Sequence, residues 1–227
     1  MPLYANVNLL LFLAPALILG IVAQFMVRSA YATTRRIPAR TSGYSAARHM
    51  LDAAGLHNVE IEQVPGDLSD HYDPREKVLR LSADVFHGRS LAAVGIAAHE
   101  AGHAIQDAHG YVPLAIRNAA VPAASFGSSA GMLAILLGFA LVLQPLLLVG
   151  IVLFSAVVFF QLVNLPVEFN ASSRAKAELV DLGIIDASEL PWVRKVLNAA
   201  ALTYVAATLQ SLLTLLYYIL AFANRRD

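Results

Sequence analysis

The chain has 227 residues, of which 58% are hydrophobic and only 14% are charged. Soluble domains are about half apolar and about a quarter charged, so this composition indicates a membrane protein. Equal numbers of acidic and basic side chains give a formal net charge of zero, and we expect no nucleic-acid partner. The chain contains no cysteine, so any metal must be held by His, Asp or Glu side chains.

The first apolar segment predicts a transmembrane helix over residues 1–27. These residues carry no charged side chain, and the apolar stretch is long enough to cross about 30 Å of hydrocarbon as a helix. A cleaved signal peptide is the alternative, but it normally begins with positive charge, whereas here the first charge is Arg28, after the apolar run. We therefore expect a retained anchor, with Pro15 inside it as a possible kink.

The polar segment 28–117 is expected to form a small α+β body. Its pattern predicts a helix over residues 42–54, which Gly55 ends. Residues 59–64 alternate between apolar and polar side chains, which is typical of a strand. Residues 77–82 predict a second strand, and the two strands are expected to pair as a hairpin.

An H-E-x-x-H motif lies on a long apolar helix predicted over residues 90–108. Its two imidazoles, on His99 and His103, are one helical turn apart on one face and can bind one zinc ion. Glu100, beside them, can take a proton from the zinc-activated water that attacks a carbonyl group. The alternative is a helix with a polar stripe and no metal, but a charged glutamate in such apolar surroundings is costly without a function.

Residues 118–165 predict a hairpin of two transmembrane helices. The segment has no charged side chain and is long enough for two spans. Gln144 and Pro145 are the natural place for the chain to turn, which gives spans near residues 123–143 and 146–165. A buried hairpin in a soluble protein is the alternative.

The rest of the chain is expected to contain a polar segment over residues 166–198, followed by a fourth transmembrane helix and tail over residues 199–227. If the spans alternate, seven basic residues lie on one side of the membrane, which the positive-inside rule makes cytoplasmic. Arg225 and Arg226 would then lie outside, against that rule. The seven residues are Arg28, Arg35, Arg36, Arg40, Arg117, Arg174 and Lys176.

A catalytic zinc site needs a third protein ligand and an open coordination position. His109 has the spacing found in metzincins, but those enzymes need a glycine where this chain has Gln106, so that the chain can turn back to the metal. Glu168 is the first charged residue after the predicted hairpin. An ordinary interfacial charge is the alternative for Glu168. Because the motif alone leaves the zinc site incomplete, we favour Glu168 over His109 as the third ligand.

The chain carries five segments that are typical of one known family. Together they resemble the YugP-like family of bacterial membrane zinc metallopeptidases, and the resemblance runs over nearly the whole chain. The segments are DHYDP at 70–74, KVLRLS at 77–82, AAHEAGHAIQ at 97–106, LPVEFNAS at 165–172 and KVLNAA at 195–200.

The resemblance implies a gluzincin site, in which His99, His103 and Glu168 bind one zinc ion per chain and Glu100 is the base. The more distant HtpX-like and CAAX-prenyl endopeptidases have a similar arrangement, with the third ligand in an E-x-x-x-D pattern. In this chain Ser172 stands at the last position of that pattern. The carboxylate that those enzymes place behind a metal ligand must therefore come from elsewhere or be absent.

Two further residues, His71 and Tyr72, are candidates for catalysis, because either could donate a hydrogen bond to a tetrahedral oxyanion. Ordinary turn chemistry is the alternative at these positions. In zincins a strand beside the site binds the extended substrate backbone, and residues 77–82 are the candidate for that strand. Asn170 and Arg174 could orient the metal ligands from the positions that follow Glu168, although residues placed like this more often form a solvated helix face.

The sequence thus predicts an α-helical membrane protein with four transmembrane helices and a small α+β zincin-like body. The expected function is a zinc metalloendopeptidase in the bacterial inner membrane, which cleaves proteins or peptides near the bilayer with its site close to the cytoplasmic face. A zinc-binding scaffold or chaperone-like protein, and a hydrolase of lipid amides, are the alternatives. No oligomeric state is predicted.

Overall fold

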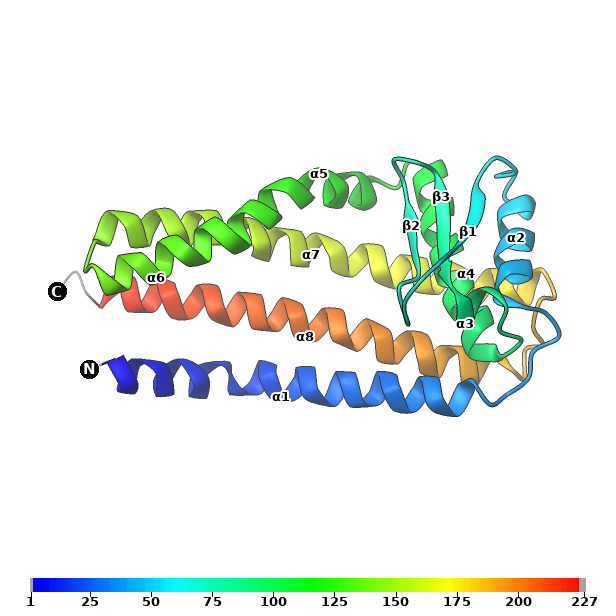
Figure 1. The fold of residues 1–227 in the computed structure, drawn as a ribbon, viewed down its shortest axis with the longest axis horizontal. Helices are drawn as coiled ribbons and strands as arrows, with labels where there is room; N and C mark the ends of the chain where they lie inside the picture. Colours follow the sequence, from blue (N-terminus) through cyan, green and yellow to red (C-terminus); the bar gives the residue numbers. More distant parts are fainter. Residues whose placement is uncertain (1, 225–227) are drawn as a thin grey trace. The chain divides into compact units, whose positions relative to one another are not determined.

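The structure is a computed structural model that describes residues 2–224, with side chains described from residue 9 onward (Figure 1). Arg225 and Arg226, which bear on the membrane orientation, lie outside the described residues. The elements in chain order are α1 (Pro2–Thr34), α2 (Gly43–Ala53), β1 (Glu60–Val64), β2 (His71–Asp73), β3 (Val78–Ser82), α3 (Ala83–Phe86), α4 (Leu91–Ala108), α5 (Val112–Phe126), the π-helix η1 (Gly127–Gly131), α6 (Met132–Ala140), α7 (Gln144–Asp181) and α8 (Leu190–Ala223).

Four helical segments of the described chain are long and apolar enough to cross a membrane: Leu9–Thr34, Val112–Ala140, Gln144–Asp181 and Leu190–Ala223. This confirms the predicted fold class, a helical membrane protein with a small α+β body. All four segments include residues outside the predicted spans, because polar residues continue the helices at their ends. The second segment nevertheless ends at Ala140, before the predicted end at residue 143. In α7, Val167, Ala171, Ala175 and Leu179 recur every four positions and are all buried, so one face of the helix remains apolar after the charged residues begin.

The described residues divide into two compact units, and α1, α5, α7 and α8 each contribute to both. One unit contains the residues up to 23, residues 115–166 and those from 203 onward. In this unit η1 and α6 pack closely on the first part of α7. Glycines make this approach possible, since a Cβ atom on Gly150 would lie only 2.8 Å from the carbonyl oxygen of Gly131. The turn between α6 and α7 includes Val142 in the left-handed region, φ 56°, just before the predicted turn at Gln144 and Pro145.

The other unit contains residues 24–114 and 167–202 and includes the sheet. The strand order is β1-β3-β2, with β1 parallel to β3 and β2 antiparallel to it. The predicted hairpin between residues 59–64 and 77–82 is therefore wrong, although both segments are strands. A parallel pair needs a crossover connection, and here that connection includes the three-residue strand β2. Because β3 is the central strand, residues 77–82 cannot be the free edge that binds a substrate.

Helix α4 is the core of this unit and is buried along most of its length. The Ser90 side chain caps its start by accepting a hydrogen bond from the Ala93 amide, 3.2 Å away. Its small residues allow close neighbours: a Cβ atom on Gly102 would lie 2.8 Å from the carbonyl oxygen of Ala171 in α7. Helices α2 and α3 and strands β2 and β3 also contact α4. The helix thus presents the H-E-x-x-H motif from a rigid position.

Candidate metal centre

The two histidines of the motif lie one turn apart on α4, as their spacing predicts. Their ring centroids are 4.8 Å apart. The His99 and His103 side chains are only 13% and 8% exposed. Two imidazoles held this closely on a buried helix can share one metal ion.

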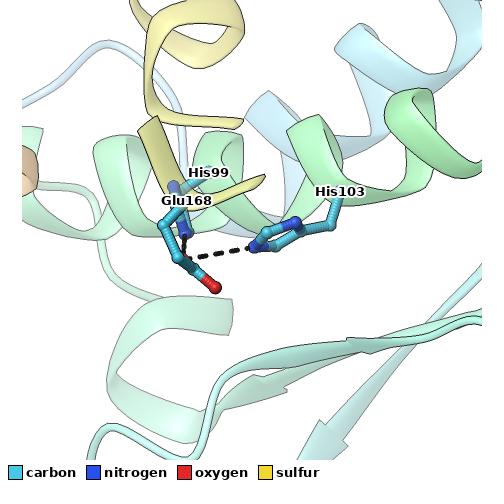
Figure 2. Close-up of side chains that lie close together, drawn as sticks. All are labelled: His99, His103 and Glu168. Carbon is cyan, nitrogen blue, oxygen red and sulfur yellow. Dashed lines mark hydrogen bonds and ion pairs between the residues drawn. The ribbon is translucent and has the colours of Figure 1, made fainter. Parts of the chain in front are cut away.

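Helix α7 brings a carboxylate to the same place. The Glu168 Oε2 atom lies 3.2 Å from His99 Nε2 and 3.6 Å from His103 Nε2 (Figure 2). One ligand atom from each of the three residues lies within 4.8 Å of the other two. Zinc bonds of about 2.0–2.1 Å in tetrahedral geometry separate neighbouring ligand atoms by about 3.3 Å, and the two distances from Glu168 Oε2 are close to this value. The set could supply three ligands to a zinc ion and would leave a fourth position open.

The second nitrogen of each imidazole has its own partner. His99 Nδ1 lies 3.1 Å from the Ser172 hydroxyl, and His103 Nδ1 lies 2.9 Å from Gln106 Oε1. The sequence marked Ser172 as a departure from the E-x-x-x-D pattern, and in the structure this serine makes the contact with the imidazole. Gln106 was not identified as a partner from the sequence. Its position three residues after His103, on the same helical face, is the signal that could have found it.

Electrostatics favour a cation between these groups. Burial acts against a charged His103, but contact with Glu168 and the nearby charge of Glu100 outweigh it and raise the His103 pKa. Protein groups that stabilise a proton on a buried imidazole create a negative potential. The same potential attracts a metal ion.

Glu100 lies beside the two imidazoles, but it makes none of the contacts that join them to Glu168, Ser172 and Gln106. Its side chain is partly exposed, and none of the hydrogen bonds among the described residues involves it. Desolvation by the surrounding protein raises the Glu100 pKa, which the charges of His99 and His103 partly offset. A partly exposed carboxylate with a raised pKa is suited to accepting a proton.

The other two catalytic candidates lie on β2 and have partners of their own. The exposed His71 places its Nδ1 atom 2.8 Å from the Ser69 carbonyl oxygen. The Tyr72 hydroxyl donates a hydrogen bond to Asp107 Oδ2 in α4, at 3.0 Å. Burial and this carboxylate raise the Tyr72 pKa strongly, so the phenol stays protonated. The catalytic roles of both residues stay predictions.

The alternative third ligand, His109, is the residue at which α4 ends. Its Nδ1 atom lies 3.4 Å from a guanidinium nitrogen of Arg174, and it is not part of the cluster that His99, His103 and Glu168 form. Glu168 is therefore the candidate that the structure brings to the two histidines.

The chain is similar in sequence to known proteins. The sequence model of a family described as "Putative neutral zinc metallopeptidase" matches residues 9–223. A relative from Bacillus subtilis (strain 168), named "Putative membrane protease YugP", is 48% identical over 214 residues, which cover 93% of this chain and 95% of the relative. No solved structure matches the chain.

Proposed function

The chain belongs to the family described as "Putative neutral zinc metallopeptidase", and from this premise we propose that it is a zinc-dependent endopeptidase of the membrane. In this proposal His99, His103 and Glu168 hold one zinc ion, and Glu100 is the general base. The observation that carries it is the convergence of donor atoms from the buried His103 and Glu168 and the partly buried His99, beside a carboxylate that has no hydrogen-bond partner among the described residues.

A bound zinc ion would supply a Lewis acid that polarises a peptide carbonyl and lowers the pKa of water. The protein's own part in hydrolysis is to position groups and move protons. The Glu100 carboxylate accepts a proton from the attacking water and afterwards transfers it to the nitrogen of the leaving amine. Its raised pKa suits both steps, because the carboxyl group holds the proton between them more readily than an exposed glutamate would.

The free edge of β2 is the proposed place for the substrate backbone. β2 is an edge strand of the described sheet, and it contacts α4 directly. The hydrogen bond from Tyr72 to Asp107 fixes this strand to the helix that carries the motif. An extended peptide that added to this edge would place its carbonyl groups along the helix, which is the arrangement that the sequence first suggested for residues 77–82.

The position of Glu168 suggests substrates at the bilayer. Glu168 directly follows a charge-free run of α7, so a metal held by this carboxylate would lie within about one helical turn, ~5 Å, of the apolar segment. We propose that the protein resides in the bacterial inner membrane and cleaves membrane proteins or peptides close to the cytoplasmic face. Cleavage of soluble unfolded protein alone, with none of membrane-embedded substrates, would contradict this part of the proposal.

Glu100→Gln tests the proposed reaction. The variant should keep one zinc ion per chain, because Glu100 is not a ligand, and should hydrolyse a proteome-derived peptide library about 10²–10⁴-fold more slowly than the wild type. Glu60→Gln, at an exposed position on β1, is the matched control and should keep wild-type activity.

Other outcomes separate the alternatives. Wild-type hydrolysis by Glu100→Gln would exclude Glu100 as the base. Zinc binding without peptide hydrolysis by the wild type would favour a scaffold or chaperone-like function. Release of fatty acid from lipid amides, without peptide cleavage, would identify a different hydrolase.

A further inference from the structure

The buried side chain of Gln106 connects the two helices that supply the metal ligands. It is fully buried, with 0% of its surface exposed. Its Oε1 atom lies 2.9 Å from His103 Nδ1, and its Nε2 atom lies 2.9 Å from the Val167 carbonyl oxygen and 3.0 Å from Asn170 Oδ1. Both N–H groups of the amide and one of the two lone pairs of its oxygen are thus occupied. We infer that Gln106 is a positioning residue, which prepares both His103 and Glu168 to bind the metal that the proposed function requires.

The contacts of Gln106 allow only one orientation of its amide. The Val167 carbonyl oxygen can only accept a hydrogen bond, so the atom facing it must be the Gln106 NH₂ group. The Asn170 contact gives the same result independently. Arg174 Nε, which can only donate, lies 2.8 Å from Asn170 Oδ1, and this fixes the Asn170 oxygen as the atom that also faces Gln106.

This orientation determines the tautomer of His103. The Gln106 oxygen faces His103 Nδ1 and can only accept, so the neutral imidazole must carry its hydrogen on Nδ1. The lone pair is then on Nε2, which is the atom 3.6 Å from the Glu168 carboxylate. A lone pair and a carboxylate oxygen repel each other at this distance unless a cation lies between them. Gln106 therefore holds His103 in the state that binds metal.

The same amide fixes the third ligand. Val167 directly precedes Glu168 in α7, so the hydrogen bond from Gln106 to its carbonyl oxygen fastens α7 to α4 beside the ligand. Asn170 lies two residues beyond Glu168 and gives a second point of attachment. One side chain thus sets the ring of one ligand and the backbone of another, as groups behind metal ligands do.

Gln106→Met tests this role, because methionine has a similar length but no amide. Competition with a chromophoric chelator should show zinc affinity about 10- to 100-fold below that of the wild type. In zinc-free protein labelled with ¹⁵N-histidine, the His103 resonances should show the Nδ1–H tautomer in the wild type and a mixture of tautomers in the variant. Gln63→Met is the matched control, since Gln63 makes the same kind of contact, 2.8 Å, to His87 on the surface and should leave zinc affinity unchanged.

Asn170 provides a second pair of variants in case Gln106→Met does not fold. Asn170→Asp keeps an oxygen that accepts from both Gln106 and Arg174 and adds a negative charge near the site, so it should bind zinc at least as tightly as the wild type. Asn170→Leu removes that acceptor and should bind zinc more weakly. Both substitutions are at a partly exposed position, where folding is expected to survive.

Three results would overturn the inference: wild-type zinc affinity in folded Gln106→Met, equal affinities of Asn170→Asp and Asn170→Leu, or an Nε2–H tautomer of His103 in the zinc-free wild type. Failure of the proposed function has a different signature. A wild-type protein that binds no zinc would refute the metal site, while the tautomer measurement would still report whether Gln106 holds His103.

Discussion

Gly102, the fourth residue of the motif, is predicted to set the distance between the two ligand-bearing helices. A Cβ atom at this position would lie 2.8 Å from the Ala171 carbonyl oxygen, whereas ordinary contacts of this kind begin at 3.4 Å. In Gly102→Ala, α7 must therefore move away from α4 by about 0.6 Å, the difference between these distances. Glu168 lies on the same face of α7, three residues before Ala171, and should move with it.

The free energies of folding and of metal binding should respond differently to Gly102→Ala. Overpacking costs about 1–3 kcal/mol, but alanine gains about 1 kcal/mol over glycine in a helix, so the net loss of stability is about 0–2 kcal/mol. Metal sites tolerate changes of only about 0.2 Å in ligand distance, which is smaller than the required shift. We expect zinc affinity to fall at least 10-fold, on the scale seen when ligand positioning is disturbed.

The assay is zinc competition with a chromophoric chelator, performed beside thermal unfolding of the zinc-free protein in the same detergent. Gly20→Ala is the matched control, because Gly20 is also helical but a Cβ atom there would have no neighbour within 4 Å. It should bind zinc like the wild type. If folded Gly102→Ala also does so, the close approach to Ala171 does not position Glu168, and the reasoning is refuted.

Three shorter predictions concern the same unit. Ser172→Ala removes the partner of His99 Nδ1 and should lower zinc affinity about 10-fold. Ser172→Asp should bind zinc as tightly as the wild type or more tightly. Competition with a chelator measures the zinc affinity of both variants. Removal of zinc with a chelator should abolish peptide hydrolysis and lower the midpoint of thermal unfolding, since zinc at about 100 times its Kd adds about 2.7 kcal/mol to stability. Tyr72→Phe should lose about 1 kcal/mol from the hydrogen bond to Asp107, measured by chemical denaturation. A fall in kcat of about 10²-fold or more in that variant would assign the hydroxyl to the oxyanion.

Local patterns predicted the helices of this protein well. The cap at Ser90, the apolar run after it and the spacing of His99 and His103 all act within a few residues, so they are visible in the sequence. The same holds for Ser42, whose side chain accepts a hydrogen bond from the Ser45 amide at the start of α2. Such signals depend only on the helical period and on capping chemistry.

The arrangement of the sheet was not visible in the same way. Alternation identified β1 and β3 as strands, but alternation does not specify which strand is the partner or in which direction it runs. The three residues of β2 are too few to show a period, and the turn-forming residues around them dominate the pattern. Pairing depends on the packing of the whole unit against α4, which no local window contains.

The third candidate ligand depends on both local sequence patterns and tertiary packing. Sequence reasoning could select Glu168 because a carboxylate ends a long charge-free run, but the distance of 3.2 Å to His99 depends on tertiary contacts. Those contacts come from residues without charge: Gly102 permits the approach of α7, Gln106 fixes its register, and Ser172 supports His99. Neutral partners raise the basicity of the imidazoles less than carboxylates would. The site should therefore owe its zinc affinity mainly to the packing of α4 on α7, so variants that change this packing should matter more than variants that change nearby surface charge.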